Sequence, residues 1–250
     1  MDAPLWLIIV GAVAAGVVQG LSGVGFSLVA LSFWAWVLDP QLAAVLAVFG
    51  GLTGQLLAAF TVRRGFDAAR VLPFILGGFL GLPLGLWLLP RVDAVAFRAG
   101  VGGLLALWCP AMLLSSRLPH VRAGGRVGDA LAGLIGGVMG PLGGFTGAVP
   151  TLWCTLRGYE RDTQRAVVQN FNLAMLSVTM ISYLASGVVK APMLPQMAIV
   201  APALLLPAWL GMKVYVGISP AAFRNVVLGL LTASGLAMLV NAALNWSRGN

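Results

Sequence analysis

Two glycine-rich stretches constrain the fold more than any other feature, because each interrupts a long apolar segment. Residues 20–26 read GLSGVGF, and residues 140–147 read GPLGGFTG. Each glycine inside a helix costs about 1 kcal/mol relative to alanine, and Pro141 removes a backbone donor and clashes with the preceding turn. We therefore expect each apolar segment to break into two half-helices at its glycine-rich stretch.

The composition is that of an integral membrane protein. Of the 250 residues, 60% are hydrophobic and 9% are charged, whereas a soluble domain has about 25% charged residues. The net charge of +8 comes from basic residues scattered singly between apolar runs, which is typical of cytoplasmic loops and not of a nucleic-acid surface. We expect the partners to be a lipid bilayer and a small solute, with no nucleic acid.

The same order of segments occurs twice along the chain. The first repeat covers residues 1–115, and a polar linker at 116–127 separates it from the second repeat at 128–250. The first repeat has a broken segment at 5–37 and spans at 41–61, 71–89 and 94–115, and the second has a broken segment at 128–156 and spans at 166–186, 195–212 and 222–245. The tripeptide Ala-Phe-Arg opens the last span of both repeats, which supports a duplication.

Charge predicts how the broken segments lie in the membrane. A straight helix over 5–37 would be about 50 Å long, against about 30 Å of hydrocarbon, so a hairpin with two arms of about 15 residues fits better. If both broken segments are re-entrant hairpins, one face carries 11 of the 15 Lys and Arg residues and the other carries 4. Because the face richer in Lys and Arg is cytoplasmic, we predict six full spans, a cytoplasmic linker and both termini outside.

Three spans per repeat would make the two repeats inverted, which is a recurrent plan of transporters with broken helices. The N-terminus of a half-helix presents unpaired N–H groups and about half a positive charge, and glycine lets a ligand approach the backbone. The two breaks would therefore meet near the midplane and bind an anion. The alternative is that the glycines only allow tight helix packing.

Polar residues near the two breaks complete the predicted site, because a polar side chain within a span usually faces a cavity or another helix. Gln55 and Asn170 are the leading candidates, and bridging between helices is the alternative for both. Arg165 opens its span at the predicted cytoplasmic edge, where it either attracts an anion or is a plain loop charge. The predicted site residues are Gln19, Ser22, Gly23, Gly25, Gln55, Gly143, Gly144, Thr146, Arg165 and Asn170.

The sequence argues against an enzyme, a metal site or a bound cofactor. His120 is the only histidine and lies in the linker, so neither a Ser–His dyad nor a two-histidine zinc motif can form in a span. Cys109 and Cys154 lie in apolar segments, where we expect them to be small buried hydrophobic residues. All seven acidic residues lie in or beside a loop, so we expect no intramembrane carboxylate relay, and transport would be facilitated diffusion or would carry a proton on the substrate, with sodium coupling left open.

The glycine-rich breaks, the duplicated pattern and the length resemble the sulfite exporter TauE/SafE family over essentially the whole chain. The second break is the closer match, with glycines at 136, 137, 140, 143, 144 and 147 and a proline at 150. The first break departs at Val24, and Val168-Gln169-Asn170 stands where many relatives have a pair of small hydroxyl residues. The resemblance implies transport of a sulfur-containing anion, such as sulfite, a sulfonate or thiosulfate, across the cytoplasmic membrane of a bacterium. An anion channel and a non-transporting assembly subunit are the alternatives.

Overall fold

The fold is a bundle of α-helices in a computed structural model that describes residues 5–23, 25–61, 65–115, 121, 123–213 and 220–249. Ten α-helices form within these ranges: α1 (Leu5–Ser22), α2 (Phe26–Trp34), α3 (Pro40–Thr61), α4 (Ala68–Leu88), α5 (Ala94–Leu113), α6 (Gly125–Gly143), α7 (Ala148–Leu156), α8 (Arg161–Ala185), α9 (Leu194–Lys213) and α10 (Pro220–Gly249). Seven of them are long and apolar enough to cross a membrane. The prediction of an all-α membrane protein with several spans is confirmed.

The described residues differ from the prediction in how many helices are long enough to span. The six predicted spans correspond to α3, α4, α5, α8, α9 and α10, and α1 is a seventh candidate. The prediction of two equal arms of about 15 residues is wrong, because α1 has 18 residues and α2 has 9, while α6 has 19 and α7 has 9. The glycines come late in each segment, so the first arm reaches about 27 Å before the helix breaks.

Several residues on which predictions depend lie outside the described residues. They are Val24 in the first break, Arg63, Arg64, Arg117 and Arg122 of the predicted cytoplasmic face, and His120 of the linker.

Aspartates at helix starts explain why most acidic residues lie beside loops. The Asp39 carboxylate accepts from the Gln41 N–H at 2.9 Å, and the Asp93 carboxylate accepts from the N–H groups of Val95 and Ala96. Each side chain satisfies backbone donors that have no partner inside the helix. Asp129 departs from this pattern, because it lies inside α6, beyond its first turn, and its side chain is buried.

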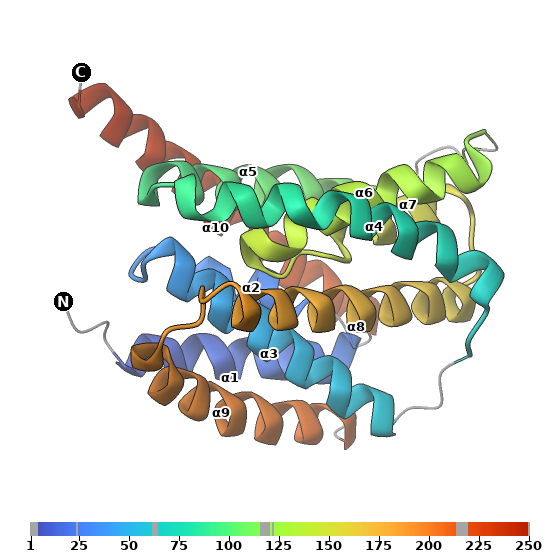
Figure 1. Ribbon diagram of the computed structural model, residues 1–250, viewed down its shortest axis with the longest axis horizontal. Coiled ribbons are helices and arrows are strands. Elements are labelled where there is room, and N and C mark those ends of the chain that lie inside the picture. The colour runs from blue at the N-terminus through green and yellow to red at the C-terminus, as the bar shows by residue number, and fades with distance from the viewer. Residues whose placement is uncertain are drawn as a thin grey trace.

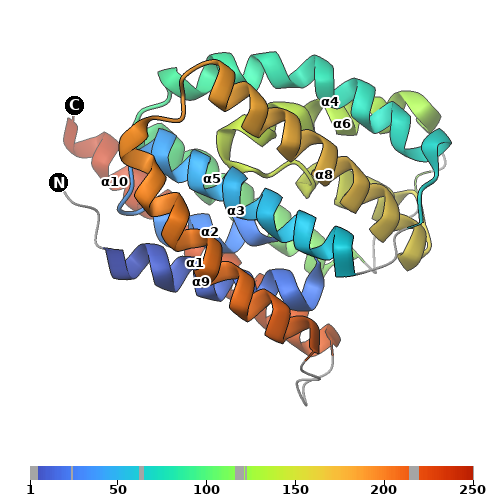
Figure 2. The same cartoon turned by 60° about the horizontal axis from the view of Figure 1, so that its bottom comes forward.

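The helices run roughly along the long axis of the molecule, and the N- and C-terminal ends lie at the same end of it (Figure 1). Four pairs of helices make the main contacts between elements distant in sequence: α1 with α9, α4 with α6, α5 with α10, and α3 with α8. The pairing of α4 with α6 is clear from both directions of view (Figures 1 and 2). The four longer helices of the first half of the chain, α1, α3, α4 and α5, thus each pack on a helix of the second half.

Glycines set the spacing in two of these pairs. A Cβ atom at Gly16 or Gly20 of α1 would lie 2.7 or 2.3 Å from a backbone oxygen of α9. A Cβ atom at Gly133 or Gly137 of α6 would lie 2.1 Å from a backbone oxygen of α4. Both α1 and α6 therefore present two glycines, four residues apart, to their partner helix. Only small residues allow two helix backbones to approach so closely.

Helices α3 and α8 are the most buried of the seven candidate spans. Each directly follows an interrupted pair of helices in the chain, α1–α2 in one case and α6–α7 in the other. Polar residues on α3 and α8 are consequently held beside the two breaks, away from lipid.

Candidate functional site

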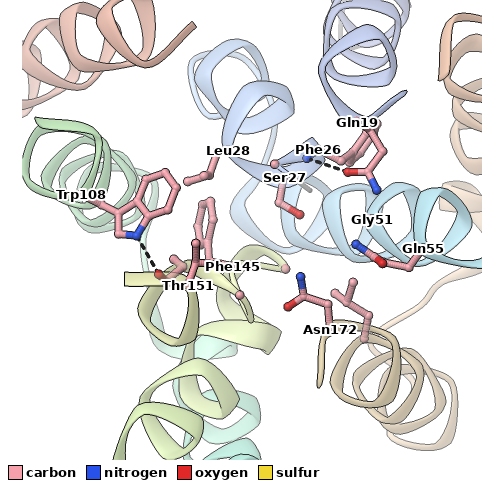
Figure 3. A pocket seen from close by; sticks show the side chains of 15 residues that line it. Gln19, Phe26, Ser27, Leu28, Gly51, Gln55, Trp108, Phe145, Thr151 and Asn172 are labelled. Carbon is pink, nitrogen blue, oxygen red and sulfur yellow. Dashed lines mark hydrogen bonds between the residues drawn. The ribbon is translucent and has the colours of Figure 1, made fainter. Parts of the chain in front are cut away.

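The two breaks line one cavity of about 70 Å³ in the interior of the bundle (Figure 3). The first break and α2 contribute Gln19, Gly25, Phe26, Ser27 and Leu28, and the second break and α7 contribute Gly144, Phe145, Gly147, Ala148 and Thr151. The remaining wall comes from Gly51 and Gln55 of α3, Trp108 of α5, and Asn172 and Leu176 of α8. Two segments more than a hundred residues apart in sequence thus meet at one cavity.

Side-chain amides stabilise the first break by hydrogen bonding to its backbone. Gly23 and Gly25 have φ angles of +75° and +101°, a left-handed conformation that glycine adopts without a Cβ clash. The Gly23 carbonyl accepts from Nε2 of Gln19 at 3.3 Å and from Nε2 of Gln55 at 3.1 Å. Because a buried carbonyl without a donor is costly, the two glutamines stabilise the interruption between α1 and α2.

The N-terminus of α2 points backbone donors at the cavity. The Phe26 N–H donates to Oε1 of Gln19 at 3.3 Å, and the Val29 N–H donates to the Gly25 carbonyl at 3.2 Å. The N–H groups of Ser27 and Leu28 come between these and have no partner within the helix, because the first turn lacks preceding carbonyls. Both residues line the cavity, so the positive end of the α2 dipole faces it.

The second break has a longer connection than the first, from Gly144 to Gly147. Gly144 has a φ angle of +72°, and its N–H closes α6 by donating to the Gly140 carbonyl at 2.6 Å. The Ala148 N–H, at the start of α7, donates to the Phe145 carbonyl at 3.1 Å, and Pro150 has no N–H. Of the first three residues of α7, Ala148 has a bonded N–H and Pro150 has none, which leaves the Val149 N–H.

The side chain of Asn172, on α8, adds an amide donor beside the second break. Its Oδ1 accepts from the Thr146 hydroxyl at 2.8 Å, which fixes the amide so that Nδ2 points toward Ser27 and Gln55 (Figure 3). Asn172 is 6% exposed, and Nδ2 makes no hydrogen bond with the residues that the structure describes. Glycine at 147 allows this approach, because a Cβ atom there would lie 2.6 Å from Nδ2.

Uncharged donors dominate the polar part of the cavity. Among the described residues that line it, none is charged, and the apolar wall comes from Phe145, Leu28 and Leu176. The Trp108 indole Nε1 donates to the Ala148 carbonyl at 2.7 Å (Figure 3) and ties α5 to α7. Amide and backbone N–H groups around a buried cavity favour an anion with several acceptor oxygens.

Seven of the ten predicted site residues lie at or directly behind the cavity. Gln19, Gly25, Gln55 and Gly144 line it. Gly23 and Thr146 hold lining side chains through the hydrogen bonds described above. Gly143 is buried against Leu31 of α2, where a Cβ atom would lie 2.6 Å from the leucine side chain.

The other three predicted residues lie outside the cavity. Ser22 is exposed, and its hydroxyl donates to the Val18 carbonyl of its own helix at 2.7 Å. The Asn170 amide donates to the Gly65 carbonyl at 3.1 Å and joins α8 to the loop before α4. Arg165 is exposed, but its guanidinium lies near the first break, with Nη2 3.5 Å from the position of a Cβ atom on Gly23.

Among the polar residues of this span, which include Gln169, Asn170 and Asn172, sequence reasoning preferred Asn170, but the structure brings Asn172 into the cavity. Two residues along a helix differ by about 200° in direction, so these two asparagines point to nearly opposite sides of α8. The signal was present in the sequence, because the apolar residues Val168, Phe171 and Met175 mark the buried side of the helix. Position 172 falls on that side. Ser27 was also missed, since nothing in the sequence distinguished its hydroxyl from the others in apolar segments.

The described helices are those of a multi-span membrane protein with a cavity at the junction of two interrupted helices. The model of the sulfite exporter TauE/SafE family matches residues 7–238, and the chain belongs to that family. It is therefore a membrane transporter and not an enzyme, and the family implies a small anionic substrate. No curated protein and no solved structure matches the chain.

Proposed function

We propose that this transporter carries a compact sulfur-containing anion, such as sulfite, thiosulfate or a small sulfonate, and binds it in the cavity between the N-termini of α2 and α7. One observation carries the proposal: the start of α2 and the Asn172 amide of α8 meet at one cavity, and no charged residue is among the described residues that line it. An oxyanion accepts several hydrogen bonds at once, so it matches this arrangement. A bare cation would meet the positive ends of two helix dipoles.

The size of the cavity favours a compact anion. A void of about 10–15 Å³ holds one water molecule, so a cavity of about 70 Å³ has room for a solute the size of a few waters. A trigonal or tetrahedral oxyanion of sulfur falls in this range. A sulfonate with a longer organic tail would need the cavity to widen, and we expect weaker binding for each added carbon.

The packing of the helices supports an inverted repeat and, with it, alternating access. If α1 corresponds to α6 and α4 to α9, then the pair α1–α9 is equivalent to the pair α6–α4. Both pairs use two glycines spaced four residues apart on the first helix of the hairpin. Movement of one hairpin and its partners relative to the other would open the shared cavity to each side in turn.

Arg165 is proposed to attract the substrate anion toward the cavity. Its guanidinium lies in an exposed position beside Gly23, and Gly23 is in turn held by the Gln19 and Gln55 amides that line the cavity. A cation at this place raises the local concentration of anions without binding them in the dry interior. Neutralising Arg165 should therefore raise KM at low salt, and the effect should shrink at high ionic strength.

Transport and substrate class can be tested together in proteoliposomes. We expect saturable sulfite flux that is accelerated by sulfite on the opposite side, and thermal stabilisation by sulfite and thiosulfate that exceeds stabilisation by taurine, sulfoacetate, phosphate or acetate. Single-channel currents would identify a channel instead, and the absence of any flux would identify an assembly subunit. Stabilisation by phosphate and acetate but by no sulfur anion would refute the substrate class.

The binding site has its own test in a pair of matched variants. Asn172→Asp replaces the inward-facing amide by a carboxylate, which should repel an anion and abolish sulfite binding. Asn245→Asp introduces the same charge at an exposed position near the end of α10 and should leave sulfite flux unchanged. Equal flux in both variants would place the substrate elsewhere.

A further inference from the structure

A second hollow lies on the outer surface of the bundle, between α4 and α6. It has a volume of about 560 Å³ and is lined almost entirely by apolar residues. Leu72, Leu76 and Leu80 of α4 form one wall, and Val127, Leu131 and Leu134 of α6 form the other. Five of these six side chains are more than half exposed, so in a membrane-spanning bundle the hollow opens toward lipid.

The hollow has the length of one lipid leaflet. Along α4 its lining runs from Ala69 to Leu80, a distance of about 16 Å at the rise of an α-helix. Half of the hydrocarbon thickness of a bilayer is about 15 Å. The hollow begins at the first turns of α4 and α6 and ends near the middle of both helices, so its depth matches a single acyl chain.

A cation stands at the open end of the hollow, where a lipid headgroup would lie. Arg126 in the first turn of α6 is exposed, lines the hollow and forms no ion pair with any residue that the structure describes. The nearby Arg70 is already engaged, because its Nε lies 3.1 Å from the Asp67 carboxylate and its guanidinium lies 5.7 Å from the centre of the Tyr159 ring. Among the described residues that line the hollow, Arg126 is therefore the charge that can pair with a phosphate.

We propose that the α4–α6 hollow binds one anionic glycerophospholipid, with an acyl chain along the leucines and the headgroup phosphate on Arg126. An apolar slot of one leaflet's depth with a basic residue at its mouth is complementary to such a lipid in both shape and charge. The site is separate from the cavity between the two breaks, since the two share no lining residue. This proposal does not depend on the identity of the transported anion.

The test uses the full chain, stripped of lipid in detergent and titrated with 1-palmitoyl-2-oleoyl-phosphatidylglycerol or with the matching phosphatidylcholine. Native mass spectrometry counts the lipids bound per chain. The wild type should bind one phosphatidylglycerol at least ten times more tightly than phosphatidylcholine. Arg126→Gln should remove this preference, and Leu131→Trp, which fills the hollow from its exposed side, should weaken binding of both lipids at this site.

Arg161→Gln is the matched control, because Arg161 is an exposed arginine at the start of α8 and does not line the hollow. It should bind phosphatidylglycerol as the wild type does. Equal lipid preference in Arg126→Gln and the wild type would overturn the proposal, as would equal binding of the two lipids by the wild type. A shift to dimers on lipid removal, reversed by Leu131→Trp, would mean that a second copy of the chain covers the hollow.

Discussion

The two interrupted helices have the same outline but present different chemistry to the cavity between them. In the first, a carbonyl at the break is held by the amides of Gln19 and Gln55, and α2 offers the backbone N–H groups of Ser27 and Leu28. In the second, the first three residues of α7 include a bonded N–H at Ala148 and a proline at 150, and the side chain of Asn172 adds an amide donor. The comparison teaches that the amides of the first half are bonded to the break itself, whereas the Asn172 amide of the second half leaves its Nδ2 facing the cavity.

The largest effect is expected where both breaks touch. A Cβ atom at Gly144 would lie 2.5 Å from the Ser27 hydroxyl oxygen and 3.3 Å from the Ala47 carbonyl oxygen, and its φ of +72° is unfavourable for a β-branched residue. Gly144→Val should therefore push the two breaks apart and reduce sulfite flux to background while the protein still inserts. Gly103→Val is the control, because a Cβ atom there meets nothing within 4 Å. Normal flux in Gly144→Val would mean that the breaks are packing devices only.

The second prediction concerns the glutamine pair of the first break. Gln55→Met removes one of two donors to the Gly23 carbonyl and should cost about 1 kcal/mol of unfolding free energy. Gln19→Met removes the other donor and also the acceptor of the Phe26 N–H, so it should cost about 2 kcal/mol. The double variant leaves the buried carbonyl without either amide, and the loss should exceed the sum of the single losses by about 1–2 kcal/mol.

Unfolding in mixed micelles with increasing dodecyl sulfate measures this coupling. The control cycle combines Gln19→Met with Gln164→Met, whose amide donates to the Thr151 carbonyl instead. Those two losses should add. If the losses of unfolding free energy were also additive for Gln19 and Gln55, the two amides would stabilise the break independently of each other.

The third prediction concerns the side-chain donor of the second break. Thr146→Val keeps the shape of the side chain but removes the hydroxyl that donates to Oδ1 of Asn172, so the amide is no longer fixed with Nδ2 toward the cavity. Loss of one neutral hydrogen bond of about 1 kcal/mol corresponds to about a fivefold weaker binding of sulfite. Titration of the purified protein followed by thermal shift measures the change.

Thr232→Val is the matched control, because the Thr232 hydroxyl donates only to the Leu228 carbonyl of its own helix. It should leave sulfite binding unchanged. If Thr146→Val bound sulfite as tightly as this control, Asn172 would not need the hydroxyl to present its amide.

The sequence predicts the membrane class, the positions of the breaks and the residues closest to them, because these follow from composition and from glycine chemistry. It predicts Gln55 on α3, but on α8 it favours Asn170, whose amide lies outside the cavity. The difference lies in helix rotation, which depends on which face of α8 is buried. The unequal arms were not predicted either, because the arm length was taken from the length of the whole segment and not from the late position of its glycines.

The smallest effect on transport is expected at a tryptophan–glycine contact that occurs in both helix pairs, α1–α2 and α6–α7. Trp34 of α2 lies on Gly11 of α1 and donates to a backbone carbonyl at 3.3 Å, whereas Trp153 of α7 lies on Gly128 of α6 and donates to the Asp129 carboxylate at 2.7 Å. The bond to the carboxylate is the stronger type, at about 1.5–3 kcal/mol against about 1 for a neutral pair.

Trp153→Phe keeps an aromatic ring on α7 but removes the donor to a buried carboxylate, so it should lower the unfolding free energy by about 1.5–3 kcal/mol. Neither Trp153 nor Asp129 lines the cavity, and sulfite flux at saturating substrate should stay close to that of the wild type. Asp129→Asn in the Trp153→Phe background should recover part of the stability, because it removes the charge that the indole no longer pairs. If Trp153→Phe remained folded but lost flux, the bond would take part in the movement of the second hairpin, and the two tryptophans would differ in function as well as in acceptor.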